Sequence, residues 1–131
     1  MDRIEFVVAK QELGVGVQEC AEPVINGMRL VEILEAAERK PTGYVGMRPE
    51  ELLSALSRPE PSVDVQVLRC SCGDDLCSWA RVEIDTHADG VVWRNLRASR
   101  AEAAAYAGLG PYRFSRGDYE RALAEPATPG G

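Results

Sequence analysis

Apolar and polar residues alternate most regularly between positions 63 and 96, on both sides of a short segment that contains glycine and two aspartates. Strict alternation is typical of strands with one buried face, and the central segment has the composition of a turn. With the loop at 73–76, the best register gives two pairs on the core face: Val67 with Val82, and Val65 with Ile84. The pattern therefore predicts an antiparallel hairpin.

The opposite face of this hairpin is mostly polar in the same register. Its pairs are Leu68 with Arg81, Gln66 with Glu83, and Asp64 with Asp85, of which only the last brings like charges together. A second turn is predicted at Asp89-Gly90, because this dipeptide suits the positive dihedral angles of a tight hairpin turn. Val91 and Trp93 then continue the core face, so the sequence predicts a three-stranded meander.

Outside the meander, residues 3–9 are predicted to form a strand and residues 14–16 a flexible loop. Helical spacing or capping signals occur in four segments: 30–37, 49–56, 99–108 and 115–124. The third of these opens with the capping box Ser99-x-x-Glu102 and is rich in alanine. Together these elements predict an α+β fold, with an antiparallel meander sheet and three to four short helices.

The length of 131 residues, with 45% apolar residues, suits a single domain with its own core. We expect this domain to cover residues 1–124. Residues 125–131 contain two prolines and two glycines and are expected to form a disordered tail.

The formal net charge of −6 limits the classes of partner that the chain is expected to bind. An acidic protein is repelled by nucleic acid and by anionic membrane surfaces, so we expect neither as a partner. The sequence has neither the layout of a signal peptide nor an apolar run long enough to span a bilayer. We therefore expect a cytoplasmic protein, whose thiols are kept reduced.

Three of the four cysteines fall at one end of the predicted hairpin. Cys70 and Cys72 are two residues apart and share a strand face, while Cys77 falls opposite Cys72, with Trp79 opposite Cys70. Clustered cysteines in a reducing compartment are more often metal ligands or redox groups than structural disulfides. The spacing predicts that the three thiols converge, and zinc is the ion expected there.

Zinc commonly takes four ligands, so a fourth group is needed beside the three thiols. His87 is the only histidine, but it lies ten residues beyond Cys77 in the sequence, or about 33 Å along a strand at about 3.3 Å per residue. Cys20, in a segment predicted as loop, is the expected fourth ligand. A water molecule or a second chain are the alternatives.

Two other interpretations of the cysteine hairpin remain open. The thiols could be reduced and partly buried groups without a metal, or Cys72 and Cys77 could form a cross-strand redox pair. Asp74 and Asp75 are interpreted as turn residues rather than as a catalytic carboxylate pair. With one histidine and no serine nucleophile motif, the sequence offers no hydrolytic triad.

The order of these motifs resembles that of a group of small actinobacterial proteins without an assigned activity. The resemblance rests on a Cys-x-Cys-Gly-x-x-x-Cys hairpin, a strand that ends near a tryptophan, the segment Gly110-Pro111-Tyr112-Arg113-Phe114 and a helix that carries Tyr119. It implies an order of elements and a cellular setting, and it assigns no catalytic residue.

These observations favour a noncatalytic binding or interaction module, with a protein partner and a structural zinc site at the cysteine hairpin. One alternative is a thiol-redox enzyme or sensor that uses Cys72 and Cys77. Another is an immunity-type or antitoxin-type binder of a basic partner, which the small size and acidic charge favour.

Overall fold

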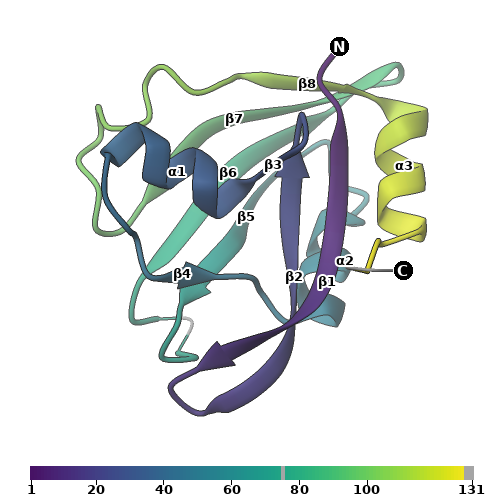
Figure 1. The fold of residues 1–131 in the computed structure, drawn as a ribbon. Coiled ribbons are helices and arrows are strands. Elements are labelled where there is room, and N and C mark those ends of the chain that lie inside the picture. The colour runs from purple at the N-terminus through teal and green to yellow at the C-terminus, as the bar shows by residue number, and fades with distance from the viewer. Residues whose placement is uncertain (75, 129–131) are drawn as a thin grey trace.

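A computed structural model describes residues 1–74 and 76–128 of the chain (Figure 1). Within them, two antiparallel sheets and three helices confirm the predicted α+β class. The three-stranded sheet contains β1 (Ile4–Leu13), β2 (Gly16–Ile25) and β3 (Met28–Arg29). The five-stranded sheet contains, in chain order, β4 (Tyr44–Val45), β5 (Ser62–Cys70), β6 (Trp79–Thr86), β7 (Gly90–Ala98) and β8 (Tyr112–Ser115).

The described helices are α1 (Leu30–Glu38), α2 (Pro49–Leu56) and α3 (Arg116–Ala124). Pro49 stands at the start of α2, where its missing N–H costs no hydrogen bond. Ser115 caps α3, because its hydroxyl accepts from the Asp118 N–H at 3.2 Å. At α1 the capping group comes from β2, where the buried carboxylate of Glu22 accepts from the Val31 N–H at 3.2 Å.

Hydrogen bonds join the two sheets at two places. Just before β1, the Asp2 N–H donates to the Arg113 carbonyl of β8 at 2.9 Å, and the Asp2 carboxylate accepts from the Arg113 N–H at 2.8 Å. In the part of β2 that β3 does not pair, Ala21 exchanges hydrogen bonds of 2.7 and 3.0 Å with Met47, which follows β4. The sheets are therefore tied together around the core that lies between them (Figure 1).

Four aromatic side chains pack against one another in that core, each from a different element. They are Phe6 of β1, Trp93 of β7, Phe114 of β8 and Tyr119 of α3. The Trp93 and Phe114 rings meet edge to face, with centroids 5.8 Å apart. The Trp93 Nε1–H donates to the Tyr119 hydroxyl at 3.2 Å, so this buried indole keeps a hydrogen-bond partner.

The β5–β6 hairpin has the predicted faces but a different register. Val65 pairs with Val82 and Val63 with Ile84, which is two residues away from the expected pairing. Because side chains alternate with a period of two, a slip of two residues leaves them on the same face. The expected clash of Asp64 with Asp85 is absent. Asp85 instead lies opposite Ser62, whose hydroxyl donates to it at 2.8 Å.

An irregularity at Val67 shifts the pairing by one residue, back toward the expected register, in the part of the hairpin that leads to the cysteines. Beyond it Leu68 pairs with Ala80 and Arg69 pairs with Trp79. The expected pairing of Trp79 with Cys70 is therefore wrong. An extra residue in one strand re-aims the side chains that follow it, and Val67, Leu68 and Arg69 are all fully buried.

The alanine-rich segment 99–108 forms successive turns instead of the predicted helix. Its hydrogen bonds span three residues, as between the Ala105 N–H and the Glu102 carbonyl at 2.9 Å. The Ser99 hydroxyl accepts from the Trp79 N–H at 2.9 Å and therefore serves the sheet instead of capping a helix. Tyr106 anchors the segment, because its side chain is buried and its hydroxyl donates to Glu38.

The first residues of the segment expected to be a disordered tail lie against β1. The Ala127 N–H donates to the Phe6 carbonyl at 2.8 Å, and the Val8 N–H donates to the Ala127 carbonyl at 2.8 Å. The edge of β1 offers unpaired backbone groups, which this short bridge satisfies. Residues 129–131 lie outside the described part of the chain.

Candidate metal centre

The thiols of Cys70, Cys72 and Cys77 converge at the closed end of the β5–β6 hairpin, as the spacing predicts. Their sulfur atoms all lie within 4.8 Å of one another. Thiolates bound to one tetrahedral zinc ion at about 2.3 Å are separated by about 3.8 Å. Small side-chain rotations are therefore enough to bring the three sulfurs into contact with a single ion.

Backbone hydrogen bonds shape the loop that carries these thiols. The Cys70 N–H donates to the Ser78 carbonyl, and the Gly73 N–H donates to the Cys70 carbonyl, each at 3.0 Å. The Asp74 N–H donates to the Cys72 sulfur at 3.4 Å. Gly73 has a φ of +90°, a conformation that residues with a side chain rarely adopt. The tight turn therefore depends on this glycine.

Asp74 acts as a turn residue, in agreement with the sequence interpretation. Its carboxylate accepts from the Leu76 N–H at 2.8 Å, which is the local bond that aspartates commonly make in turns. Asp75, the second member of the acidic pair, lies outside the described residues. The interpretation of the two aspartates as a catalytic pair gains no support from Asp74.

The turn between β1 and β2 supports the cysteine loop from one side. The Gly14 N–H donates to the Ser71 carbonyl at 2.8 Å, and the Ser71 N–H donates to the Gly43 carbonyl at 3.0 Å. A Cβ atom at Gly73 would come within 3.0 Å of the Val15 side chain, so the two turns are in close contact. The β1–β2 turn and the segment at Gly43 thus both hold the loop in place.

The three thiols share their protons unequally. The backbone N–H of Cys72 and the Ser78 hydroxyl stabilise the Cys70 thiolate and lower the pKa of Cys70 to about 7. Hydrogen bonds to the sulfurs of Cys70 and Cys72 raise the pKa of Cys77 to about 11. At neutral pH Cys70 is therefore partly ionised, while Cys77 keeps its proton.

The cluster is open to solvent. Cys72 and Cys77 are exposed, Cys70 is half-buried, and the Arg100 guanidinium approaches the Cys77 sulfur at 3.6 Å. Among the described residues, no fourth histidine, cysteine or carboxylate side chain joins the three thiols. The arrangement can therefore offer an incoming ion three sulfur ligands and an accessible fourth side.

Cys20 is not brought to this cluster, and it does not lie in a loop. It is a fully buried residue of β2, where the Arg69 Nη2 lies 3.5 Å from its sulfur. Arg69 also donates to the Gly46 carbonyl at 2.9 Å, so both side chains are fixed within the core. His87 is exposed beyond β6, at the other end of the hairpin from the thiols, as the sequence indicates.

Sequence reasoning missed Arg69 as a structural residue beside the site. Its side chain is fully buried and links β5 to β2, through a 3.2 Å bond to Gln18 and the contact with Cys20. The residue directly precedes Cys70, so the same strand end positions the first thiol. The sign of this role in the sequence is a single arginine at the end of a strand in which apolar and polar residues otherwise alternate.

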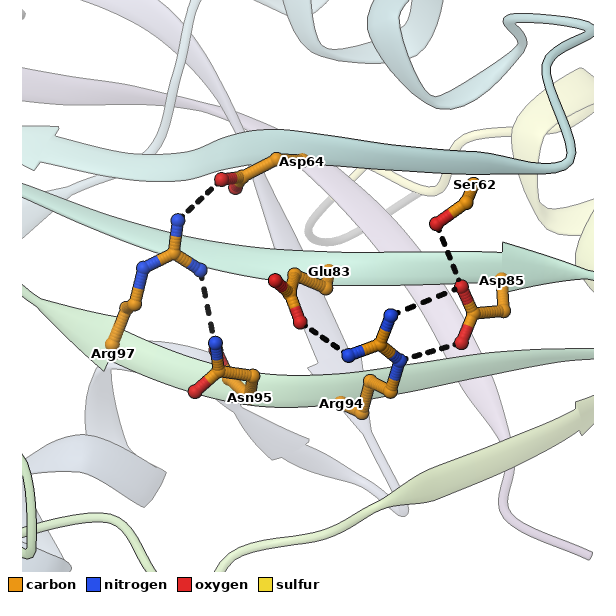
Figure 2. A network of polar contacts seen from close by, with 7 residues as sticks. All are labelled: Ser62, Asp64, Glu83, Asp85, Arg94, Asn95 and Arg97. Atoms are coloured by element: carbon orange, nitrogen blue, oxygen red, sulfur yellow. Dashed lines mark hydrogen bonds and ion pairs between the residues drawn. The ribbon is translucent and has the colours of Figure 1, made fainter.

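The solvent face of the five-stranded sheet carries a second polar cluster, which Figure 2 shows. Arg94 binds Asp85 at 2.6 Å and also pairs with Glu83, while Arg97 pairs with Asp64. Arg94 lowers the pKa of Asp85 below its usual range. Each of these arginines already faces a carboxylate, so this face is not a basic surface.

No family model matches the sequence, and no curated protein or solved structure matches it either. None of the described helices is both long enough and apolar enough to cross a membrane. The geometry of the thiol cluster and the charge of the chain are therefore the features that bear on function.

Proposed function

We propose that the protein is a noncatalytic cytosolic binding module whose cysteine hairpin is held by a zinc ion on Cys70, Cys72 and Cys77. The observation that carries this proposal is the convergence of three sulfur atoms within 4.8 Å of one another. Thiolates are preferred zinc ligands, and structural zinc sites contribute directly to folding free energy. The fourth ligand is a water molecule or a group from a partner.

The zinc ion would fix a loop that otherwise depends on backbone hydrogen bonds, and so would present a defined surface to a protein partner. The net charge of −6 favours a partner with a basic surface, because such surfaces attract each other over long range. An immunity-type or antitoxin-type binder is one form that such a module would take.

Native mass spectrometry tests the metal site directly. We expect protein purified under reducing conditions, without a histidine tag, to carry one zinc ion per chain, which is lost in the denatured mass. Cys72→Ser should abolish the mass excess, whereas Cys20→Ala should retain it, because Cys20 lies apart from the cluster. A native mass without excess, together with four free thiols, would contradict the proposal.

A thiol-redox role for Cys72 and Cys77 is the second candidate. It is favoured by the exposure of both side chains and by the neighbouring Cys70, whose pKa is lowered to about 7. In this case one cysteine of the metal-free protein should react rapidly with iodoacetamide, and mild oxidation should remove two hydrogens in forming a disulfide. Slow and uniform labelling of the thiols would count against this candidate.

A further inference from the structure

A cleft lies between the C-terminal end of α2 and the helix α3, at the end of the β6–β7 hairpin farthest from the cysteines. Its volume is about 390 Å³, which falls within the range of about 300–1,000 Å³ that is usual for small-molecule sites. Leu56, Val91, Tyr119 and Leu123 supply apolar lining, and Arg58 and Arg116 are its two cationic residues.

The apolar side of the cleft belongs to the core. Leu56, Val91 and Tyr119 are all buried, so they come from three firmly packed elements. The Tyr119 hydroxyl already accepts from the Trp93 indole at 3.2 Å, so this polar atom has a partner inside the core. An aliphatic chain that entered the cleft would therefore meet a preformed apolar surface.

Each of the two arginines in the lining already binds one carboxylate. Arg116 donates to Glu120 at 3.0 Å and to the His87 carbonyl at 3.2 Å, and Arg58 donates to Glu60 at 3.3 Å. These four side chains balance in charge, but neither arginine uses all of its donors. On the sheet face of Figure 2, by contrast, the Nε, Nη1 and Nη2 atoms of Arg94 all bind carboxylates.

These arginines keep donors for another anion. A guanidinium has five N–H groups, and the contacts of Arg116 use its Nε and Nη1 atoms, which leaves Nη2. Both side chains are about half exposed, at 51% for Arg58 and 45% for Arg116, and surface ion pairs of this kind are weak. A carboxylate can therefore add to them, or replace an acidic neighbour, at low cost.

We propose that this cleft binds an amphipathic carboxylate, with its aliphatic chain against Leu56 and Leu123 and its carboxylate on Arg116 and Arg58. Apolar lining alone would suit a neutral ligand, but the unused guanidinium donors favour an anion, because hydrogen bonds between charged groups are stronger than those between neutral groups. Planar guanidinium groups bind carboxylates with two parallel hydrogen bonds, which gives such a ligand a defined orientation.

Isothermal titration calorimetry of the full chain with octanoate tests this proposal, with octanol as the uncharged ligand of equal length. We expect octanoate to bind at least about tenfold more tightly than octanol, because hydrogen bonds between charged groups are stronger than those to a neutral hydroxyl. Arg116→Gln should weaken octanoate binding by about tenfold. Arg121→Gln is the matched control, since Arg121 lies on the same helix, pairs with Asp118 at 3.2 Å and does not line the cleft.

Three results would overturn the proposal. The first is equal binding of octanoate and octanol, and the second is an equal loss of affinity in Arg116→Gln and Arg121→Gln. The third is the absence of both heat and amide chemical-shift changes at millimolar octanoate. Thermal unfolding of each variant separates a loss of binding from a loss of the fold.

Discussion

The two ends of the molecule are held together in different ways. At one end, four aromatic side chains from β1, β7, β8 and α3 pack against one another in the core. At the other end, the cysteine loop is held by backbone hydrogen bonds, and two of its three thiols are exposed. The aromatic end is stabilised by its own side chains, whereas the cysteine end has ligand groups that a bound ion would complete.

Removing an aromatic ring should have the largest effect. Trp93→Ala is expected to lower the free energy of unfolding by about 3–5 kcal/mol, because the ring is fully buried among aromatic neighbours. Urea denaturation measures this change. Trp79→Ala is the comparison at the cysteine end, where the half-buried ring stacks with Arg81, and its cost should be clearly smaller. Equal costs would remove the contrast between the two ends.

Zinc binding should stabilise the protein by an amount comparable to the effect of Trp93→Ala, but only when the ion is present. With zinc at about one hundred times its dissociation constant, the free energy of unfolding is expected to rise by about 2.7 kcal/mol. Urea denaturation with zinc and with a chelator measures this gain. Cys72→Ser should remove the gain and leave the metal-free stability within about 0.5 kcal/mol, because Cys72 is exposed. A zinc effect that survives this substitution would place the ion elsewhere.

The junction between the two sheets should tolerate little added volume. A Cβ atom at Gly46 would lie 2.4 Å from the Ala21 carbonyl oxygen, which belongs to the backbone and cannot rotate away. Gly46→Ala is therefore expected to cost about 1–3 kcal/mol or more, measured by thermal unfolding. Gly108→Ala provides the control, because nothing lies within 4 Å of its Cβ position. If both variants have the same melting temperature, the sheets are not closely joined at this point.

The smallest expected effect concerns the protonation of the thiols, and it leaves the fold intact. Alkylation of the metal-free protein should accelerate as the pH rises through about 7, because the lowered pKa of Cys70 produces a thiolate there. Cys77, whose pKa is raised to about 11, should stay unreactive in this range. Peptide mapping after timed iodoacetamide treatment identifies the labelled residue. Cys70→Ser should remove the acceleration near pH 7, because the thiol with the lowered pKa is then absent.

The β5–β7 meander could be predicted because its core faces alternate. The expected form of its second turn is wrong, since neither Asp89 nor Gly90 has a positive φ and Gly90 is already the first residue of β7. The irregularity at Val67 could not be predicted, since Val67, Leu68 and Arg69 give no sign of which residue is extra. The predicted convergence of the three thiols is confirmed although the predicted register is wrong. It depends on the short spacing of the cysteines around a tight turn more than on exact strand pairing.

The position of Cys20 could not be predicted, because β2 does not show a clean alternation of apolar and polar residues. Its buried Glu22 is satisfied by Arg29 and by the start of α1, and its buried Cys20 lies beside Arg69. These partners are distant in the sequence, so local sequence patterns cannot predict the contacts. The helix predicted over 99–108 is absent for a related reason. The Ser99 hydroxyl accepts from the Trp79 N–H instead of capping a helix.

The contact between Asp2 and Arg113 bears on how the molecule behaves in concentrated solution. An exposed strand at the edge of a sheet is a template on which other chains can add and aggregate. Asp2 occupies both backbone groups of Arg113 on β8, which is only four residues long, and Ala127 occupies backbone groups of β1 in the same way. Both sheets thus have partly covered edges, which protects the folded protein against strand-to-strand self-assembly.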